Sequence, residues 1–246
     1  MNQNSTDFKG ILRDKQAISF DVGFTLIYTE PPVGTVYAGI AADFGYRLDA
    51  GEVQDRFVRI WKAKSHLARQ EKNAALANEE KAYRWWKEIF SAAVGETVSP
   101  QDLENMFHVC FNEYARGVYW RLYPDVLPAL ESLRAGGLRL AVLSNWDRRL
   151  LKTLNELHLD GYFEKIYIST LIGQTKPEAA AFQYVIDDLG ISGQLLLHVG
   201  DTWEEDILGA QQAGIAAVWL NRPGKNKTAP GHRQVPVISS LAELLV

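Results

Sequence analysis

The chain has 246 residues, 47% of them hydrophobic and 23% charged, which is the composition of a globular protein and excludes global disorder. Its 26 basic and 30 acidic side chains give a net charge of −4, which argues against a dedicated nucleic-acid-binding protein. One cysteine, Cys110, excludes an intrachain disulfide and fits a reducing compartment. Because no apolar run approaches the roughly 20 residues of a membrane span, and residues 1–15 are polar, we expect a cytoplasmic protein with no membrane association.

Short apolar runs alternate along the chain with amphipathic segments of helical length. The expected strands cover Ala17–Phe20, 138–143, Lys165–Ile168, 195–199 and Ala216–Leu220. The expected helices between them cover 124–135, 148–158, 178–189 and 204–213. Uniformly apolar strands that alternate with helices are typical of a parallel sheet with helices on both faces. We therefore predict a doubly wound α/β core.

Helix starts and loops can be placed within this pattern. Residues 175–178 and 202–205 each fit a capping box, in which a threonine side chain begins the helix. The polar stretch 222–235 predicts a surface loop, and residues 1–15 predict a short flexible lead-in.

Residues 33 to 119 have a different texture from the rest of the chain. They contain no convincing strand, and large apolar residues such as Trp61, Trp86 and Phe107 recur at helical spacing. We predict a helical domain over residues 31–119, inserted into a core formed by residues 1–30 and 120–246. Because Trp85 and Trp86 cannot face the same way on a helix, we expect one in the core of this domain and the other at a cleft.

Polar residues follow the expected strands. Asp21 follows the first, Ser144 and Asn145 the second, and Asp201 a later one, while Lys176 opens a helix. In an open parallel sheet, ligands bind at the carboxyl ends of the strands. Two carboxylates beside a lysine suit a hard divalent cation with a phosphate next to it.

These residues carry a family resemblance. The segments that carry it are 20–26 (motif I), 142–145 (motif II), 176–177 (motif III) and 199–201 with Asp206 (motif IV). In this order and spacing they resemble the four motifs of the haloacid dehalogenase (HAD) superfamily, and the helical insert resembles its C1-type cap. The run 144–149 and the pair Trp85-Trp86 are similar to the subgroup related to the HAD-like hydrolase domain-containing protein 3.

The resemblance implies a reaction and a metal. Asp21 would be the nucleophile that attacks phosphorus and forms an aspartyl-phosphate intermediate. Mg²⁺ would be held by the Asp21 carboxylate, the Gly23 carbonyl and Asp201.

The resemblance also implies roles for the remaining motif residues. Ser144, Asn145 and Thr25 would bind the substrate, and Lys176 would neutralise the transferring group and pair with Asp21. Asp206 would complete the metal site by orienting metal-bound water.

One residue departs from the family pattern. Phosphatases of this superfamily carry a second Asp two residues after the nucleophile as general acid and base, and here that position is Gly23. Losing such a group costs about 10²–10⁴-fold in rate. The substrate could have an acidic leaving group, such as a sugar-1-phosphate or acyl phosphate; another carboxylate (Glu30, Asp147 or Glu204) could substitute; or the enzyme could be weak or lost.

The function we predict is a Mg²⁺-dependent phosphatase for a small phosphorylated metabolite, with no protein partner evident. The alternatives are a metal-independent, haloacid-dehalogenase-like hydrolase and a non-catalytic protein that binds phosphate or metal. Asp201 and Asp206 favour metal and phosphate over dehalogenation. We expect His198 and Cys110 to be buried structural residues rather than ligands.

Overall fold

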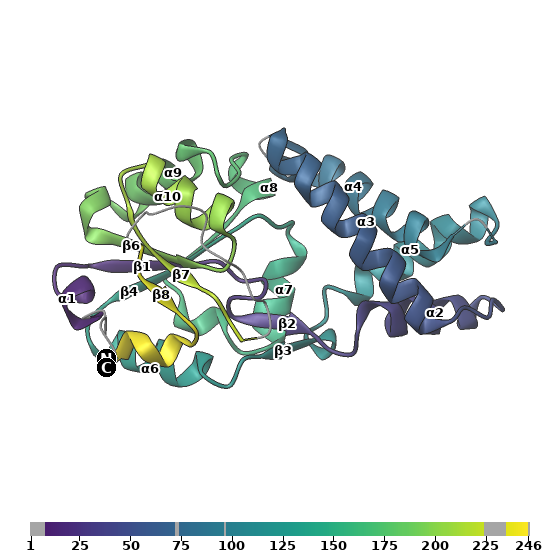
Figure 1. The fold of residues 1–246 in the computed structure, drawn as a ribbon, viewed down its shortest axis with the longest axis horizontal. Helices are drawn as coiled ribbons and strands as arrows, with labels where there is room; N and C mark the ends of the chain where they lie inside the picture. The colour runs from purple at the N-terminus through teal and green to yellow at the C-terminus, as the bar shows by residue number, and fades with distance from the viewer. Residues whose placement is uncertain (1–7, 72–73, 96, 224–234, 246) are drawn as a thin grey trace, which may run out of the picture.

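A parallel sheet of six strands, in the order β5-β4-β1-β6-β7-β8, forms the centre of the computed structural model, which describes residues 8–71, 74–95, 97–223 and 235–245 (Figure 1). The strands are β1 (Ala17–Phe20), β4 (Arg139–Ser144), β5 (Lys165–Ile168), β6 (Leu196–Gly200), β7 (Ala216–Leu220) and β8 (Val237–Ile238). All five pairings are parallel, which confirms the predicted α/β class. The two-residue β8 was not predicted.

Helices cover both faces of the sheet, because each strand presents apolar side chains in both directions. The helices α6 (Val126–Ala135) and α7 (Arg149–Glu156) and the 3₁₀ turn η6 (Leu241–Leu245) pack against Ile18 and Phe20. The helices α9 (Ala179–Leu189) and α10 (Gly209–Gln212) pack against Ala17 and the other face. Figure 1 shows α6 and α9 on opposite sides of the sheet.

Two expectations about helix starts are wrong. Helix α9 begins after Glu178, so Thr175 is not the residue that begins it. The segment after Thr202 is a π-helical turn, η5 (Trp203–Leu208), and the Thr202 side chain does not cap it. Instead the Asp206 carboxylate accepts a hydrogen bond from the Thr202 N–H at 2.8 Å, because this acidic side chain turns back toward the strand end.

The ends of two expected irregular segments are ordered. Within the expected lead-in, Phe8–Leu12 forms the short helix α1, and residues 1–7 lie outside the described part. Arg222, expected in a surface loop, is buried. Its guanidinium pairs with Asp125 at 3.0 Å and donates to the Thr25 carbonyl, which anchors the motif I segment. Residues 224–234 of that expected loop lie outside the described residues.

A helical insert separates β1 from β4. It comprises α2 (Val33–Asp43), α3 (Ala50–Gln70), η1 (Ala74–Ala77), α4 (Glu79–Val94), α5 (Pro100–Glu113) and η2 (Gly117–Tyr119). An antiparallel pair at its base, β2 (Ile27–Thr29) and β3 (Trp120–Leu122), was not predicted. Within the described part of 33–119 there is no strand, whereas the domain bounds at 31 and 119 stay a prediction. No described helix is both long and apolar enough to cross a bilayer.

The insert contacts the core at its far end as well as at its base. The Leu76 carbonyl of η1 accepts a hydrogen bond from Ser169 Oγ at 2.6 Å, and Ser169 begins helix α8 (Ser169–Ile172). Glu79, at the start of α4, accepts a hydrogen bond from the Arg148 N–H at 3.0 Å. Figure 1 shows the end of the α3–α4 hairpin beside α8. The hairpin therefore spans the edge of the sheet at which the polar residues gather.

Candidate active site

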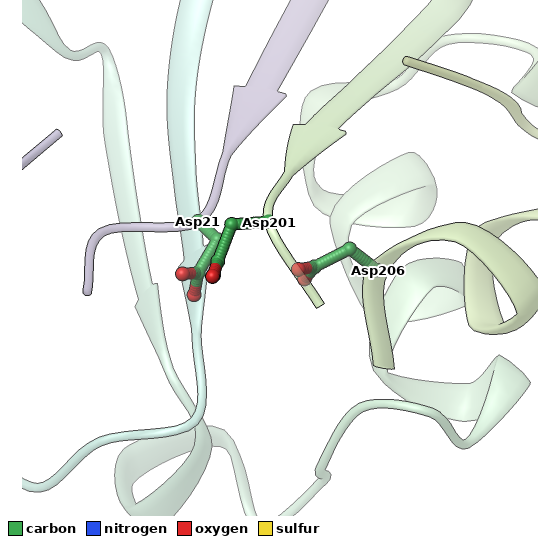
Figure 2. A group of neighbouring side chains, drawn as sticks. All are labelled: Asp21, Asp201 and Asp206. Atoms are coloured by element: carbon green, nitrogen blue, oxygen red, sulfur yellow. The ribbon is translucent and has the colours of Figure 1, made fainter. Parts of the chain in front are cut away.

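Three aspartates meet at the carboxyl ends of the central strands. Strand β1 pairs in register with β4 on one side and β6 on the other, so the residues that follow these strands come together. Figure 2 shows Asp21 and Asp201 side by side after their strands, with Asp206 facing them from the neighbouring helical turn. Their carboxylate oxygens can be chosen within 4.8 Å of one another, which suits a single divalent cation.

Asp21 is held by donors on both of its oxygens. Ser144 Oγ donates to Oδ1 at 2.9 Å and Lys176 Nζ donates to the same atom at 2.8 Å. Thr25 Oγ1 lies 3.5 Å from Oδ2. Burial raises the pKa of Asp21 to about 6, opposed by Lys176 and assisted by the nearby carboxylates of Asp206 and Asp201. The side chain is therefore largely ionised at neutral pH and fixed in position.

Lys176 is a buried cation between two carboxylates. Its Nζ lies 2.6 Å from Asp206 Oδ1 and 2.8 Å from Asp21 Oδ1. Burial lowers the pKa of Lys176, but the charges of Asp206 and Asp21 outweigh burial and raise the pKa above its ordinary value. The Asn145 side-chain amide fixes the backbone beneath it, accepting from the Lys176 N–H at 2.9 Å and donating to its carbonyl at 2.8 Å. The ammonium is therefore charged and fixed in position.

Asp206 anchors this ammonium from behind. Besides Lys176, its carboxylate accepts from the Thr202 N–H and lies 3.2 Å from His198 Nε2. Burial raises the pKa of Asp206, but Lys176 and His198 more than reverse this, and the pKa falls below its usual range. His198 Nδ1 in turn lies 2.8 Å from Ser19 Oγ. His198 is the satisfied buried histidine that we expected, but its contact with Asp206 was missed; a histidine inside an apolar strand signals such a buried partner.

Two glycines at the site, Gly200 and Gly23, differ in whether a side chain could replace their hydrogen. A Cβ on Gly200 would lie 2.2 Å from Asp206 Cγ, so any side chain there would displace the Asp206 carboxylate. A Cβ on Gly23 would lie 3.4 Å from the Trp146 ring, an ordinary contact. Position 23 therefore accepts a Cβ without a clash.

The site opens into a cavity of about 860 Å³ between the core and the insert. Its polar end is lined by Asp21, Gly23, Ser144, Asn145 and Asp201. Thr25 and Lys176 were also predicted for the site, but they are buried behind the Asp21 carboxylate, and Asp206 is buried beside them. The structure thus brings all the predicted site residues together in two layers.

The remainder of the cavity wall is aromatic. Trp85 and Trp86 both line it, with ring centroids 4.8 Å apart at 83°, so the expectation that only one would face a cleft is wrong. Neighbouring residues on a helix project about 100° apart, and the cavity is wide enough to contact both. Cys110 is buried in the insert as expected, and it also lies against the cavity.

The carboxylates considered as replacements for a second motif I Asp lie in different places. Glu30 accepts a hydrogen bond from the Tyr28 hydroxyl at 3.4 Å. Asp147 accepts two hydrogen bonds of 2.7 Å from the Arg149 guanidinium. Neither carboxylate lines the cavity. Glu204 lines the cavity but is exposed.

Glu205 was missed by sequence reasoning, and it is better placed than these three carboxylates. It lines the cavity, accepts a hydrogen bond from Asn145 Nδ2 at 2.9 Å, and lies 4.0 Å from Arg69 of α3. Burial raises the pKa of Glu205 to about 7, with Lys176 opposing the rise and Asp206 adding to it. The two neighbouring glutamates cannot be told apart in the sequence. In the structure, the hydrogen bond from Asn145 distinguishes Glu205 from Glu204.

Comparisons with known proteins agree with this geometry. The family described as "Hydrolase: haloacid dehalogenase-like hydrolase" matches residues 15–214. The Haloacid dehalogenase-like hydrolase domain-containing protein 3 of Danio rerio is 28% identical over 232 residues, which cover 92% of this chain and 93% of the relative. A glyceraldehyde 3-phosphate phosphatase of Methanopyrus kandleri is 35% identical over 105 residues, 42% of this chain and 45% of the relative.

A solved structure shares the fold over nearly the whole chain. The HAD-hydrolase YfnB from Bacillus subtilis, crystallised with magnesium, superimposes with a TM-score of 0.70 at 20% identity, covering 94% of this chain and 96% of that one. Since the family match spans most of the chain and the four motifs converge on one site, this chain belongs to the haloacid dehalogenase-like hydrolases.

Proposed function

We propose that this hydrolase is a Mg²⁺-dependent phosphatase, which transfers the phosphoryl group of a phosphate monoester to Asp21 and then to water. The arrangement of Asp21 is the observation that carries the proposal. Its carboxylate is aligned by Ser144 and Lys176 and lies beside Asp201 at the polar end of the cavity. A carboxylate fixed next to an ammonium and a hydroxyl suits attack on phosphorus, because the ammonium keeps the carboxylate ionised and the Ser144 hydroxyl at the cavity can also hold a phosphoryl oxygen.

The residues fit a magnesium ion. Asp21 and Asp201 offer carboxylate oxygens, and the Gly23 carbonyl accepts no hydrogen bond from the described residues. Lys176 pairs with Asp21 and Asp206, and the carboxylate oxygens of Asp21, Asp201 and Asp206 lie within 4.8 Å of one another, an oxygen-rich cluster of the kind that suits a hard cation. When bound, Mg²⁺ would neutralise charge between Asp21 and the phosphate dianion. Both Asp206 oxygens already accept hydrogen bonds, so we assign Asp206 to holding Lys176 and to orienting metal-bound water.

The chain's own groups supply the remaining chemistry. Asp21 attacks phosphorus, and Ser144 and the Asn145 backbone hold the transferring phosphoryl group. The buried Lys176 ammonium pairs with Asp21 and neutralises charge beside the reacting carboxylate. The helices α2–α5 act as a cap that excludes bulk water and contacts the leaving group. Because Gly23 supplies no acid, we assign water activation in the second step to Glu205, the carboxylate that Asn145 holds at the cavity wall.

The similar proteins support phosphoryl chemistry in general terms. One relative is named as a glyceraldehyde 3-phosphate phosphatase, and the structurally similar YfnB was crystallised with magnesium. A dehalogenase-like reaction uses the same nucleophile without a metal. The clustered Asp21, Asp201 and Asp206 favour the metal-dependent reaction over that alternative.

Phosphate release from p-nitrophenyl phosphate tests the proposal. Wild type should turn over with Mg²⁺ and stop with EDTA, and Asp21→Asn should lose at least about 10³-fold while keeping its melting temperature. Asp55→Asn, an exposed position on α3, is the matched control and should behave as wild type. Asp21-dependent turnover that is indifferent to EDTA, together with halide release from a 2-haloacid, would replace the phosphatase by a dehalogenase.

A further inference from the structure

The aromatic part of the cavity is larger than the chemistry at its polar end requires. Cavities for drug-sized ligands run to about 300–1,000 Å³, and this one reaches about 860 Å³. Its wall includes Phe24, Trp61, Trp85, Trp86, Phe111 and Trp146. A two- or three-carbon phosphate would touch the polar end alone and leave this aromatic surface in contact with water. Exposed apolar surface is unfavourable in free energy, and an apolar leaving group that covers it would bind more tightly.

Phe24 is the aromatic residue of the wall that lies nearest in sequence to Asp21. It lies three residues after Asp21, has a left-handed backbone (φ 58°), is 37% exposed and lines the cavity. A bulky residue with positive φ is strained, and such strain collects at functional sites. The ring meets Trp61 of α3 edge-to-face at 6.2 Å, so one aromatic pair bridges core and insert beside the reacting carboxylate.

The guanidinium groups on the wall are already matched by carboxylates. Arg149 is bound by Asp147 through two hydrogen bonds and stacks over the Phe111 ring at 3.5 Å. Arg69 faces Glu205. This part of the wall therefore complements a planar apolar group better than a second acidic one.

Gly23 gives an independent reason for an aromatic leaving group. Position 23 carries no acid to protonate a departing oxygen, and an alkoxide leaves poorly unprotonated because its alcohol has a pKa near the roughly 15.7 of water. A phenol, with a pKa near 10, leaves readily as an aryloxide. The missing acid and the aromatic wall thus select the same chemistry.

We infer that the substrates are aryl phosphates, phosphate monoesters of phenol-like alcohols, with the ring held by Phe24, Trp61 and the Trp85–Trp86 pair. Resting on the proposed phosphatase, the inference specifies its leaving group. Asp21 forms a bond to phosphorus as the bond from phosphorus to the aryl oxygen breaks, and the aryloxide takes a proton from solvent. Water then attacks phosphorus, loses a proton, restores the carboxylate and releases inorganic phosphate.

A three-substrate comparison tests this inference. 2-Naphthyl phosphate has a ring and an acidic leaving group, acetyl phosphate has only the acidic leaving group, and glycerol phosphate has neither. We expect kcat/KM to fall in that order. Trp61→Ala should lower the ratio of kcat/KM for naphthyl phosphate to kcat/KM for acetyl phosphate about tenfold. Trp61→Phe, which keeps an aromatic ring, should retain most of the wild-type ratio. Tyr184→Ala, an exposed aromatic on α9, should leave the ratio unchanged.

The two proposals fail differently. Asp21-dependent turnover of acetyl phosphate with no preference for the naphthyl ester, or a ratio that Trp61→Ala does not change, overturns the aryl inference and leaves the phosphatase standing. No Asp21-dependent turnover of any of the three overturns the phosphatase, and the aryl phosphate reaction with it. As a readout independent of turnover, Asp21→Asn should bind 2-naphthyl phosphate at least about tenfold more tightly than glycerol phosphate, by quenching of tryptophan fluorescence.

Discussion

The two ends of the cavity are built by different means. At the polar end, Ser144 is the last residue of β4, and Asp21 and Asp201 directly follow β1 and β6, so the register of the sheet brings them together. The aromatic wall is assembled from helices of the insert and two loop residues of the core, Phe24 and Trp146. Backbone geometry fixes the first, whereas the second depends on how the insert sits on the core. Reaction chemistry and substrate choice can therefore vary separately in this fold.

Removing the shared cation should cause the largest effect. Lys176→Met leaves Asp21 and Asp206 buried without the cation that they share, so we expect a loss of about 3–5 kcal/mol in unfolding free energy together with loss of phosphatase activity. Lys64→Met, which breaks an exposed pair with Glu88, should cost no more than about 1 kcal/mol. Urea unfolding of both variants measures the difference. Equal costs would mean that the polar end is not held together by this charge.

Restoring an acid at position 23 should alter the chemistry of the leaving group. Since a Cβ fits there, Gly23→Asp should raise the rate on alkyl phosphates about 10–10²-fold and change the rate on aryl phosphates much less. Gly23→Asn adds the same bulk without the acid and should give no gain. Steady-state kinetics on both ester classes checks this, and an equal gain from Asn would assign the effect to shape.

Proton competition should appear at the metal site. Because the pKa of Asp21 is raised to about 6, the carboxylate is charged above that pH and protonated below it. Mg²⁺ affinity should thus weaken about tenfold per pH unit as the pH falls below 6 and level off above it. The Mg²⁺-induced rise in melting temperature at pH 5 and pH 7 reports this affinity. Asp21→Asn should abolish the pH dependence and Asp55→Asn should retain it; a flat wild-type profile would contradict the assignment.

The smallest expected change lies in the aromatic wall. The buried Tyr114 hydroxyl has no hydrogen-bond partner among the described residues, so Tyr114→Phe should stabilise the protein by about 1 kcal/mol. Tyr46 is the matched control, because its hydroxyl donates to Asp102 at 2.6 Å, and Tyr46→Phe should destabilise by a similar amount. Chemical denaturation measures both. Destabilisation by Tyr114→Phe would show that its hydroxyl has a partner.

The sheet was predictable because buried parallel strands are continuous apolar runs. The bounds of β1, β5 and β7 agree with those expected, and the polar residue after each site-forming strand marked the site. The pair β2–β3 and the strand β8 have only two or three residues each, which is too short to show a period.

The contacts that hold the site depend on long-range packing, which sequence patterns do not report. The contact between His198 and Asp206 joins a strand to the helical turn that follows, and Asn145 reaches both the Lys176 backbone and Glu205. Thr175 and Thr202 resembled helix caps, but neither begins its helix with a side-chain cap. Their neighbours, Lys176 and Asp201, lie in the site.

Gly200 shows how far such a site extends beyond the groups that react. Replacing it by alanine adds one methyl group at a strand end, a change that a substitution table scores as mild. The methyl would occupy the place of the Asp206 carboxylate and so release the far side of Lys176. In a survey of natural variants, Gly200→Ala should therefore be grouped with active-site lesions, and a chain with any other residue at 200 would need a different partner for its lysine.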